Sequence, residues 1–207
     1  MSMKTKLVSA AEPDAIEQAV QRLQAGELVA FPTDTVYGLG ALAQNIQGIQ
    51  QLYEVKGRES AKAIPILISD MAEIFQVAAR VDERALRLAQ YFWPGPLTLL
   101  VPRHPSIPDI LTPYPTVGVR VPDHPIALAL LRRTGPLATT SANLSNRPSA
   151  TTADEVLNQL SGRIPFILDG GKTPGGVSST VVDCSGVQLS ILRQGPITME
   201  MLLQAIS

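Results

Sequence analysis

Signals for α-helix and β-strand alternate along the whole chain, and this alternation limits the possible folds more than any other feature of the sequence. Amphipathic stretches predict helices near residues 14–24, 46–55, 82–92, 126–133, 153–160 and 199–206. Short apolar runs predict strands near residues 28–31, 63–68, 97–101, 117–121, 136–140, 166–169, 180–183 and 188–193. The last strands follow one another with no helix between them. The sequence therefore predicts an α/β fold with a mixed sheet flanked by helices, and not a purely parallel, doubly wound sheet.

The length of 207 residues suits one hydrophobic core, so we expect residues 1–207 to form a single domain. Hydrophobic residues make up 45% of the chain and charged residues 17%, which is typical of a soluble globular protein. No apolar run approaches the length of a membrane span, and the N-terminal segment lacks the apolar stretch of a secretory signal. These features predict a cytoplasmic protein without membrane contact.

Composition also excludes several kinds of site. A single cysteine, Cys184, excludes an intramolecular disulfide framework. With only two histidines, His104 and His124, the chain has no Cys/His cluster of the zinc type, and we expect no protein-held metal site. The net charge of -1 argues against a broadly basic surface for nucleic acid, although a local patch is compatible with a neutral total.

Two glycine-rich stretches imitate nucleotide-binding motifs. Residues 38–43, G-L-G-A-L-A, satisfy the dinucleotide pattern G-x-G-x-x-A, but Pro32 and the residues D-T-V-Y separate them from the preceding strand. Residues 170–173, G-G-K-T, imitate the end of a P-loop, but Phe166 stands where the first glycine belongs. A hydrolase nucleophile motif, G-x-S-x-G, is absent. We therefore interpret both stretches as structural, the second as a turn.

Clusters of polar residues lie at the ends of predicted strands. Lys56, Arg58 and Lys62 place three cations within seven residues, which suits a polyphosphate but also a solvated surface. The segment T-T-S-A-N, residues 139–143, is either an exposed turn or the lining of a site, because burying so many polar groups without partners is unfavourable. Arg120 lies among valines in a predicted core strand. It is therefore either paired within the protein or available to a substrate carboxylate.

Six segments in order along the chain resemble one known family. They are P-T-D-T-V-Y-G-L-G, K-G-R with a second lysine, V-G-V-R-V-P, T-S-A-N, G-V-S-S-T-V-V-D and I-L-R-Q-G. Together they resemble the YrdC-like family, the L-threonylcarbamoyladenylate synthases, over nearly the whole chain. Any one of these segments is a weak signal, whereas six in sequence form a strong one. The chain is similar to the short, single-domain form of that family.

The resemblance implies a fold and a reaction. The fold would be a twisted mixed sheet wrapped by helices, with a concave and basic site. The reaction would convert L-threonine, bicarbonate and ATP, bound with Mg2+, into threonylcarbamoyladenylate and pyrophosphate. This step precedes threonylcarbamoyladenosine modification of tRNA, so proteins that transfer the group to tRNA are implied as downstream partners. A threonine carbamate attacking the α-phosphate requires proximity and charge neutralisation, and we name no general base.

The resemblance also assigns roles to individual positions of this chain. Lys56, Arg58 and Lys62 would serve catalysis. ATP would contact Arg58, Lys62, Thr116, Ser141, Ser149 and Arg193. L-Threonine would contact Thr35, Arg120, Thr139 and Ser179. Asp34 and Tyr37 are interpreted as supports of their loop, and Gly38 and Gly40 as positions where the backbone turns tightly beside the ligand.

Some positions depart from the family pattern, and two alternatives to the synthase stay open. Leu67 stands where many relatives have histidine, Ala63 where proline is common, and Glu59 adds an acid beside Arg58. One alternative is an RNA-binding maturation factor that has the same fold and contacts tRNA or double-stranded RNA through a basic concave surface. The other is an ATP-dependent carbamoyltransferase that acts on a different acceptor. The T-S-A-N segment and Arg193 favour the synthase, because a pure RNA binder needs no set of small-molecule hydroxyl contacts.

Overall fold

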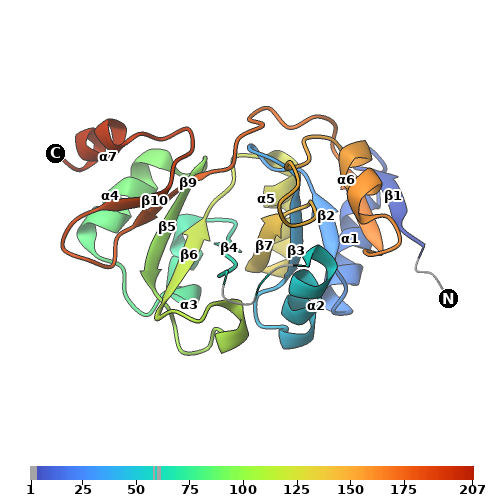
Figure 1. Cartoon of the computed structure of the whole chain (residues 1–207), viewed down its shortest axis with the longest axis horizontal. Helices are drawn as coiled ribbons and strands as arrows, with labels where there is room; N and C mark the ends of the chain where they lie inside the picture. Colours follow the sequence, from blue (N-terminus) through green and yellow to red (C-terminus); the bar gives the residue numbers. More distant parts are fainter. Residues whose placement is uncertain (1–3, 58, 60–61) are drawn as a thin grey trace.

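The computed structural model describes residues 4–57, 59 and 62–207, and its strands form one ten-stranded sheet that extends along the length of the molecule (Figure 1). The strand order is β1-β8-β2-β3-β7-β4-β6-β5-β9-β10. The strands are β1 (Lys6–Ser9), β2 (Val29–Phe31), β3 (Gly38–Leu42), β4 (Ile66–Leu67), β5 (Leu97–Pro102), β6 (Thr116–Arg120), β7 (Leu137–Ser141), β8 (Phe166–Asp169), β9 (Thr180–Asp183) and β10 (Ser190–Arg193).

The sheet is mixed, as the sequence predicts. Strand β8 pairs in parallel with both β1 and β2, and the pairs β4–β6 and β5–β9 are also parallel. The pairs β2–β3, β3–β7, β4–β7, β5–β6 and β9–β10 are antiparallel. The predicted α/β class, with a twisted mixed sheet flanked by helices, is therefore confirmed (Figure 1).

Helices cover the sheet where the amphipathic stretches predict them. They are α1 (Ala15–Gln24), α2 (Ile46–Lys56), α3 (Ile74–Val77), α4 (Glu83–Phe92), α5 (Pro125–Thr134), α6 (Ala153–Leu160) and α7 (Met199–Ile206), with short 3-10 turns η1 (Met71–Glu73) and η2 (Asp109–Leu111). Side chains of Asn45, Asp82, Thr152 and Thr198 accept hydrogen bonds from backbone N–H groups in the first turns of α2, α4, α6 and α7. In the part of the chain that the structure describes, no helix has the length and apolar character needed to span a bilayer.

The two faces of the sheet bury separate apolar clusters. In β8, Phe166 and Leu168 belong to the cluster beneath α1 and α5, whereas Ile167 between them belongs to the larger cluster on the other face. This alternation follows from the two-residue period of a strand, and it explains why the first three residues of β8 are all apolar. Helix α1 contacts α5, and α4 contacts α7 at the end of the molecule that contains the C-terminus (Figure 1).

The structure corrects the interpretation of Gly38 and Gly40. Both lie inside strand β3, which the sequence does not predict, and neither is at a tight turn. A Cβ atom on Gly38 would lie 2.8 Å from the Thr139 side chain, and one on Gly40 would lie 2.9 Å from the Phe31 ring. These glycines are therefore needed for close packing across β2, β3 and β7. The same placement confirms that the G-x-G-x-x-A stretch is no strand-to-helix turn.

Candidate active site

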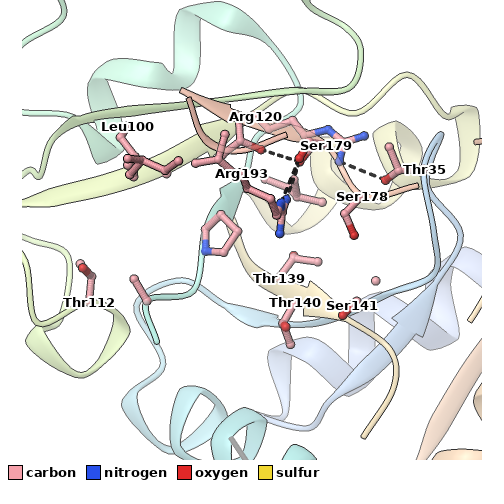
Figure 2. A pocket seen from close by; sticks show the side chains of 18 of the residues that line it. Thr35, Leu100, Thr112, Arg120, Thr139, Thr140, Ser141, Ser178, Ser179 and Arg193 are labelled. Carbon is pink, nitrogen blue, oxygen red and sulfur yellow. Dashed lines mark hydrogen bonds between the residues drawn. The ribbon is translucent and has the colours of Figure 1, made fainter. Parts of the chain in front are cut away.

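A pocket of about 560 Å3 lies where β3, β7, β4, β6, β5 and β9 adjoin, and loops from both halves of the chain close around it (Figure 2). Its wall contains most of the positions that the sequence assigns to substrates. They are Thr35, Thr116, Arg120, Thr139, Ser141, Ser179 and Arg193. Thr35 lies in the loop between β2 and β3, and Ser179 immediately precedes β9, so the folded sheet brings together side chains that are far apart in sequence.

Arg120, at the end of β6, is both paired within the protein and part of the pocket wall. It is 5% exposed. Its Nε donates to the Gly95 carbonyl at 2.9 Å, its Nη1 donates to Thr35 Oγ1 at 3.1 Å, and its Nη2 forms an ion pair with Asp34. Burial lowers the pKa of the Arg120 guanidinium, and Asp34 opposes that shift. The internal pairing of Arg120 is therefore confirmed, whereas its contact with a substrate carboxylate stays a prediction.

A second arginine of the pocket lining, Arg193, is bonded to Ser179. Arg193 donates from Nε to the Ser179 carbonyl and from Nη2 to Ser179 Oγ, both at 3.0 Å (Figure 2). Ser179 Oγ also lies 2.9 Å from Thr98 Oγ1. Thr98 is 2% exposed and lines the pocket, although the sequence analysis did not single it out. Its only signal was one hydroxyl within the apolar run L-T-L-L-V.

Tyr37 attaches the pocket wall to the loop that follows β8. Its hydroxyl donates to the Gly171 carbonyl at 2.7 Å, and the Gly170 N–H donates to the same hydroxyl at 3.2 Å. The hydroxyl also lies 3.3 Å from Asp169 Oδ1. Burial raises the pKa of Tyr37 above its ordinary value, and the Asp169 carboxylate adds to the rise. Tyr37 therefore carries its proton at neutral pH and acts as a structural hydrogen-bond donor.

The loop of residues 170–178 is tied to the Thr35 loop at a second point. The Gly176 N–H donates to the Thr35 carbonyl at 2.7 Å, and Gly176 has a φ of 66°, in the left-handed region that favours glycine. Gly175 packs so closely that a Cβ atom there would lie 2.6 Å from the Asp34 carbonyl oxygen. These contacts deliver Ser178 and Ser179 to the pocket wall. They also support the interpretation of G-G-K-T as a structural segment.

Lys56 is not among the described residues that line the pocket, and its predicted catalytic role stays a prediction. It is 3% exposed at the end of α2, and its Nζ donates to the backbone carbonyl oxygens of Ser141 and Asn143. An ammonium group held by carbonyl oxygens fixes the path of the T-S-A-N segment. Lys56 therefore supports the pocket from behind, where it positions Ser141.

Lys62 and Ser149 are not among the described residues that line the pocket. The side chain of Lys62 is 50% exposed, and its Nζ lies 3.6 Å from Glu59 Oε2. Ser149 is partly buried in the loop between β7 and α6. Arg58 lies outside the described residues. The nucleotide contacts expected of Lys62, Ser149 and Arg58 stay predictions.

The pocket has a polar side and an apolar side. Hydroxyl groups and the Arg120 guanidinium surround one side, and Figure 2 places Leu100 and Thr112 away from Thr35, Ser141 and Ser178. The apolar lining includes Leu100, Pro115 and Val181, with Tyr114 and Leu192 exposed by 54% and 60%. Leu67, which departs from the family pattern described above, also lines the pocket and is 4% exposed.

The charge of the pocket is mixed in the part that the structure describes. Its lining contains the guanidinium groups of Arg120 and Arg193 and the carboxylate of Asp183. Asp183 Oδ1 accepts from both the backbone N–H and the hydroxyl of Ser185, at 2.8 and 2.6 Å. Among the described residues, no group of three or more His, Cys, Asp or Glu side chains is placed to hold a metal ion. The predicted basic character of the site stays a prediction.

Comparison with known proteins places this fold and pocket in a family. The family model Sua5_yciO_yrdC, described as "Telomere recombination", matches residues 21–195. A Mycobacterium tuberculosis protein named putative threonylcarbamoyl-AMP synthase is 35% identical over 207 residues, which cover 98% of this chain and 95% of that protein. The chain belongs to the Sua5–YciO–YrdC family, as the sequence motifs indicate.

Other relatives are longer than this chain. Bacillus subtilis threonylcarbamoyl-AMP synthase is 46% identical over 188 residues, which cover 89% of this chain and 54% of that protein. The crystal structure of Pyrococcus abyssi Sua5 complexed with L-threonine superimposes with a TM-score of 0.94 at 39% identity, and the match covers 98% of this chain and 61% of that one. The chain thus spans about half the length of the Bacillus subtilis relative.

Proposed function

We propose that the chain is a nucleotidyltransferase that forms threonylcarbamoyladenylate and pyrophosphate from L-threonine, bicarbonate and ATP. The observation that carries the proposal is the convergence of Thr35, Thr116, Arg120, Thr139, Ser141, Ser179 and Arg193 on one pocket. Relatives named threonylcarbamoyl-AMP synthase, and a similar structure complexed with L-threonine, support it.

The polar side of the pocket suits an amino acid. Each terminal nitrogen of Arg120 uses one N–H for Thr35 or Asp34, which leaves one N–H on each for a carboxylate. The Thr139 and Ser179 hydroxyls also line the pocket and would offer hydrogen bonds to the remaining polar groups of L-threonine. Because only one methyl group separates threonine from serine, we expect modest discrimination between them.

The apolar side of the pocket suits the adenine base. Tyr114 and Leu192 present exposed apolar surface, and Leu100 of β5 and Val181 of β9 add apolar lining. Thr116, Ser141 and Arg193 would then contact the ribose and the α-phosphate. Arg58 and Lys62 would contact the outer phosphates and the leaving pyrophosphate, and Ser149 would contribute to the nucleotide site.

The chemistry then depends on position and charge. The carbamate formed from threonine and bicarbonate would attack the α-phosphate, and pyrophosphate would leave on the opposite side. Arginine and lysine groups would stabilise the charge that develops on the phosphate oxygens. Mg2+ would enter with ATP and neutralise phosphate charge, held mainly by phosphates and water, which agrees with a pocket lining rich in hydroxyl groups.

The product would supply the threonylcarbamoyl group for tRNA modification, and further proteins would carry out that transfer. Direct contact with tRNA or double-stranded RNA stays a prediction, as does activity on another acceptor. The experiment below separates these possibilities from the synthase.

The test is pyrophosphate release by the purified protein with ATP and Mg2+, with L-threonine and bicarbonate added separately and together. We expect release only when both are present. Arg193→Ala, in a folded protein, should reduce release at least tenfold, whereas Arg132→Ala on the exposed surface of α5 should not. A folded, ATP-binding preparation that releases none under any combination would refute the synthase and favour RNA binding. Release that requires an acceptor other than threonine would favour the carbamoyltransferase.

A further inference from the structure

Asp34 lies directly behind the pocket wall, next to Arg120. Its side chain is 9% exposed, and it does not line the pocket. Asp34 Oδ1 accepts from Arg120 Nη2 and from the backbone N–H of Asp123, the latter at 3.1 Å. A buried carboxylate therefore joins the guanidinium at the end of β6 to the chain that follows this strand.

The bonds of Asp34 and Thr35 fix the plane of the Arg120 guanidinium. Each of its three nitrogens donates to a different partner: Gly95 O, Thr35 Oγ1 or Asp34 Oδ1. A planar group held at three points has no free rotation, so the direction of its remaining N–H groups is set before a ligand arrives. Without Asp34, Arg120 would be a buried cation without an ionic partner among the described residues.

The negative charge of Asp34 is what distinguishes it from an asparagine at this position. Both bonds to the side chain use Oδ1, and an asparagine amide oxygen at that place could accept both. Asp34 Oδ2 is buried and has no hydrogen-bond partner among the described residues. A carboxylate with one oxygen left unpaired contributes mainly the negative charge that opposes the Arg120 cation.

We propose that Asp34 is a positioning residue that holds the Arg120 guanidinium in the orientation that receives the carboxylate of the amino-acid substrate. This inference rests on the proposed function, and it goes beyond the role of Asp34 as a support of its loop. It assigns to Asp34 an effect on amino-acid affinity that does not extend to the nucleotide.

The test compares Asp34→Asn with Asp123→Asn, which removes an equal charge from an exposed side chain one residue before His124. In the pyrophosphate-release assay, Asp34→Asn should raise the KM for L-threonine about tenfold and leave the KM for ATP within twofold. Asp123→Asn should leave both unchanged. In an Arg120→Lys background, Asp34→Asn should change the threonine KM less than twofold, because the residue acts through Arg120.

A spectroscopic measurement keeps the inference independent of turnover. The Nε–H of Arg120, observed by 15N NMR in the full chain, should exchange with solvent at least tenfold faster in Asp34→Asn than in the wild type. Wild-type exchange and a wild-type threonine KM in folded Asp34→Asn would overturn the inference while the proposed function stands. A wild-type protein that neither binds threonine nor releases pyrophosphate would overturn both.

Discussion

The Tyr37 hydroxyl joins strand β3 to the loop of residues 170–178, and its removal gives a quantitative test of how the pocket is held together. Tyr37→Phe keeps the buried ring but removes the donor to the Gly171 carbonyl and the acceptor for the Gly170 N–H. Each such bond contributes about 1 kcal/mol to stability, so we expect the free energy of unfolding to fall by about 2 kcal/mol. For a chain of this size, that corresponds to a decrease in Tm of about 4–8 °C.

The assay is thermal denaturation of the wild type, Tyr37→Phe and the control Tyr91→Phe, whose ring is 70% exposed. We expect Tyr91→Phe to match the wild type. The loop of residues 170–178 also carries Ser178 and Ser179 to the pocket, so Tyr37→Phe should increase amide hydrogen exchange at Gly170 and Gly171. A Tm within 1 °C of the wild type, with unchanged exchange at these amides, would refute the reasoning.

Three further changes test other parts of the structure. Lys56→Met removes the donor to two backbone carbonyl oxygens and should lower the free energy of unfolding, measured by urea titration, by about 2–4 kcal/mol. The control Lys172→Met changes an exposed side chain and should have no effect. Equal urea midpoints for Lys56→Met and the wild type would contradict this prediction. Gly38→Ala places a Cβ atom against the Thr139 side chain, so it should lower the free energy of unfolding by about 1–3 kcal/mol and raise the KM for threonine. A urea midpoint and a threonine KM equal to those of the wild type would disprove the packing argument. Burial raises the pKa of the Cys184 thiol from 9.0 to about 12. The thiol therefore loses its proton at a lower pH in the unfolded chain than in the folded one, and the free energy of unfolding decreases as the pH rises above 9. By pH 10 the loss attributable to this thiol should be on the order of 1 kcal/mol, and Cys184→Ala should lose correspondingly less than the wild type between pH 8 and 10.

The sequence by itself determined most helices, most strands and the mixed character of the sheet. Apolar periodicity and helix caps are local signals, so the helix that begins after Asp82 and the strand F-I-L-D could be predicted from nearby residues. Strand β3 was missed because Gly38 and Gly40 weaken the local strand signal. Glycine is needed at both positions because the side chains of Phe31 and Thr139, from the neighbouring strands, leave no space for a Cβ atom.

The sequence also identified the family and, through it, seven of the side chains that line the pocket. Each motif is a short run of residues with a recognisable pattern, and the order of the six motifs along the chain identifies the family. The pattern could not distinguish a residue that faces the pocket from one that stands behind it, as Lys56 does. Thr98 was missed for the same reason, since one hydroxyl in an apolar strand has no local signature.

Only the tertiary structure decided how the polar groups are partnered. Arg120 could be assigned from the sequence either to an internal pair or to a ligand, and the fold gives it Asp34 as an ionic partner while leaving it on the pocket wall. Arg193 and Ser179 come together because β9 and β10 pair in an antiparallel register. Burial and hydrogen bonding depend on atoms contributed by distant segments, and for that reason they are properties of the folded chain that no local pattern contains.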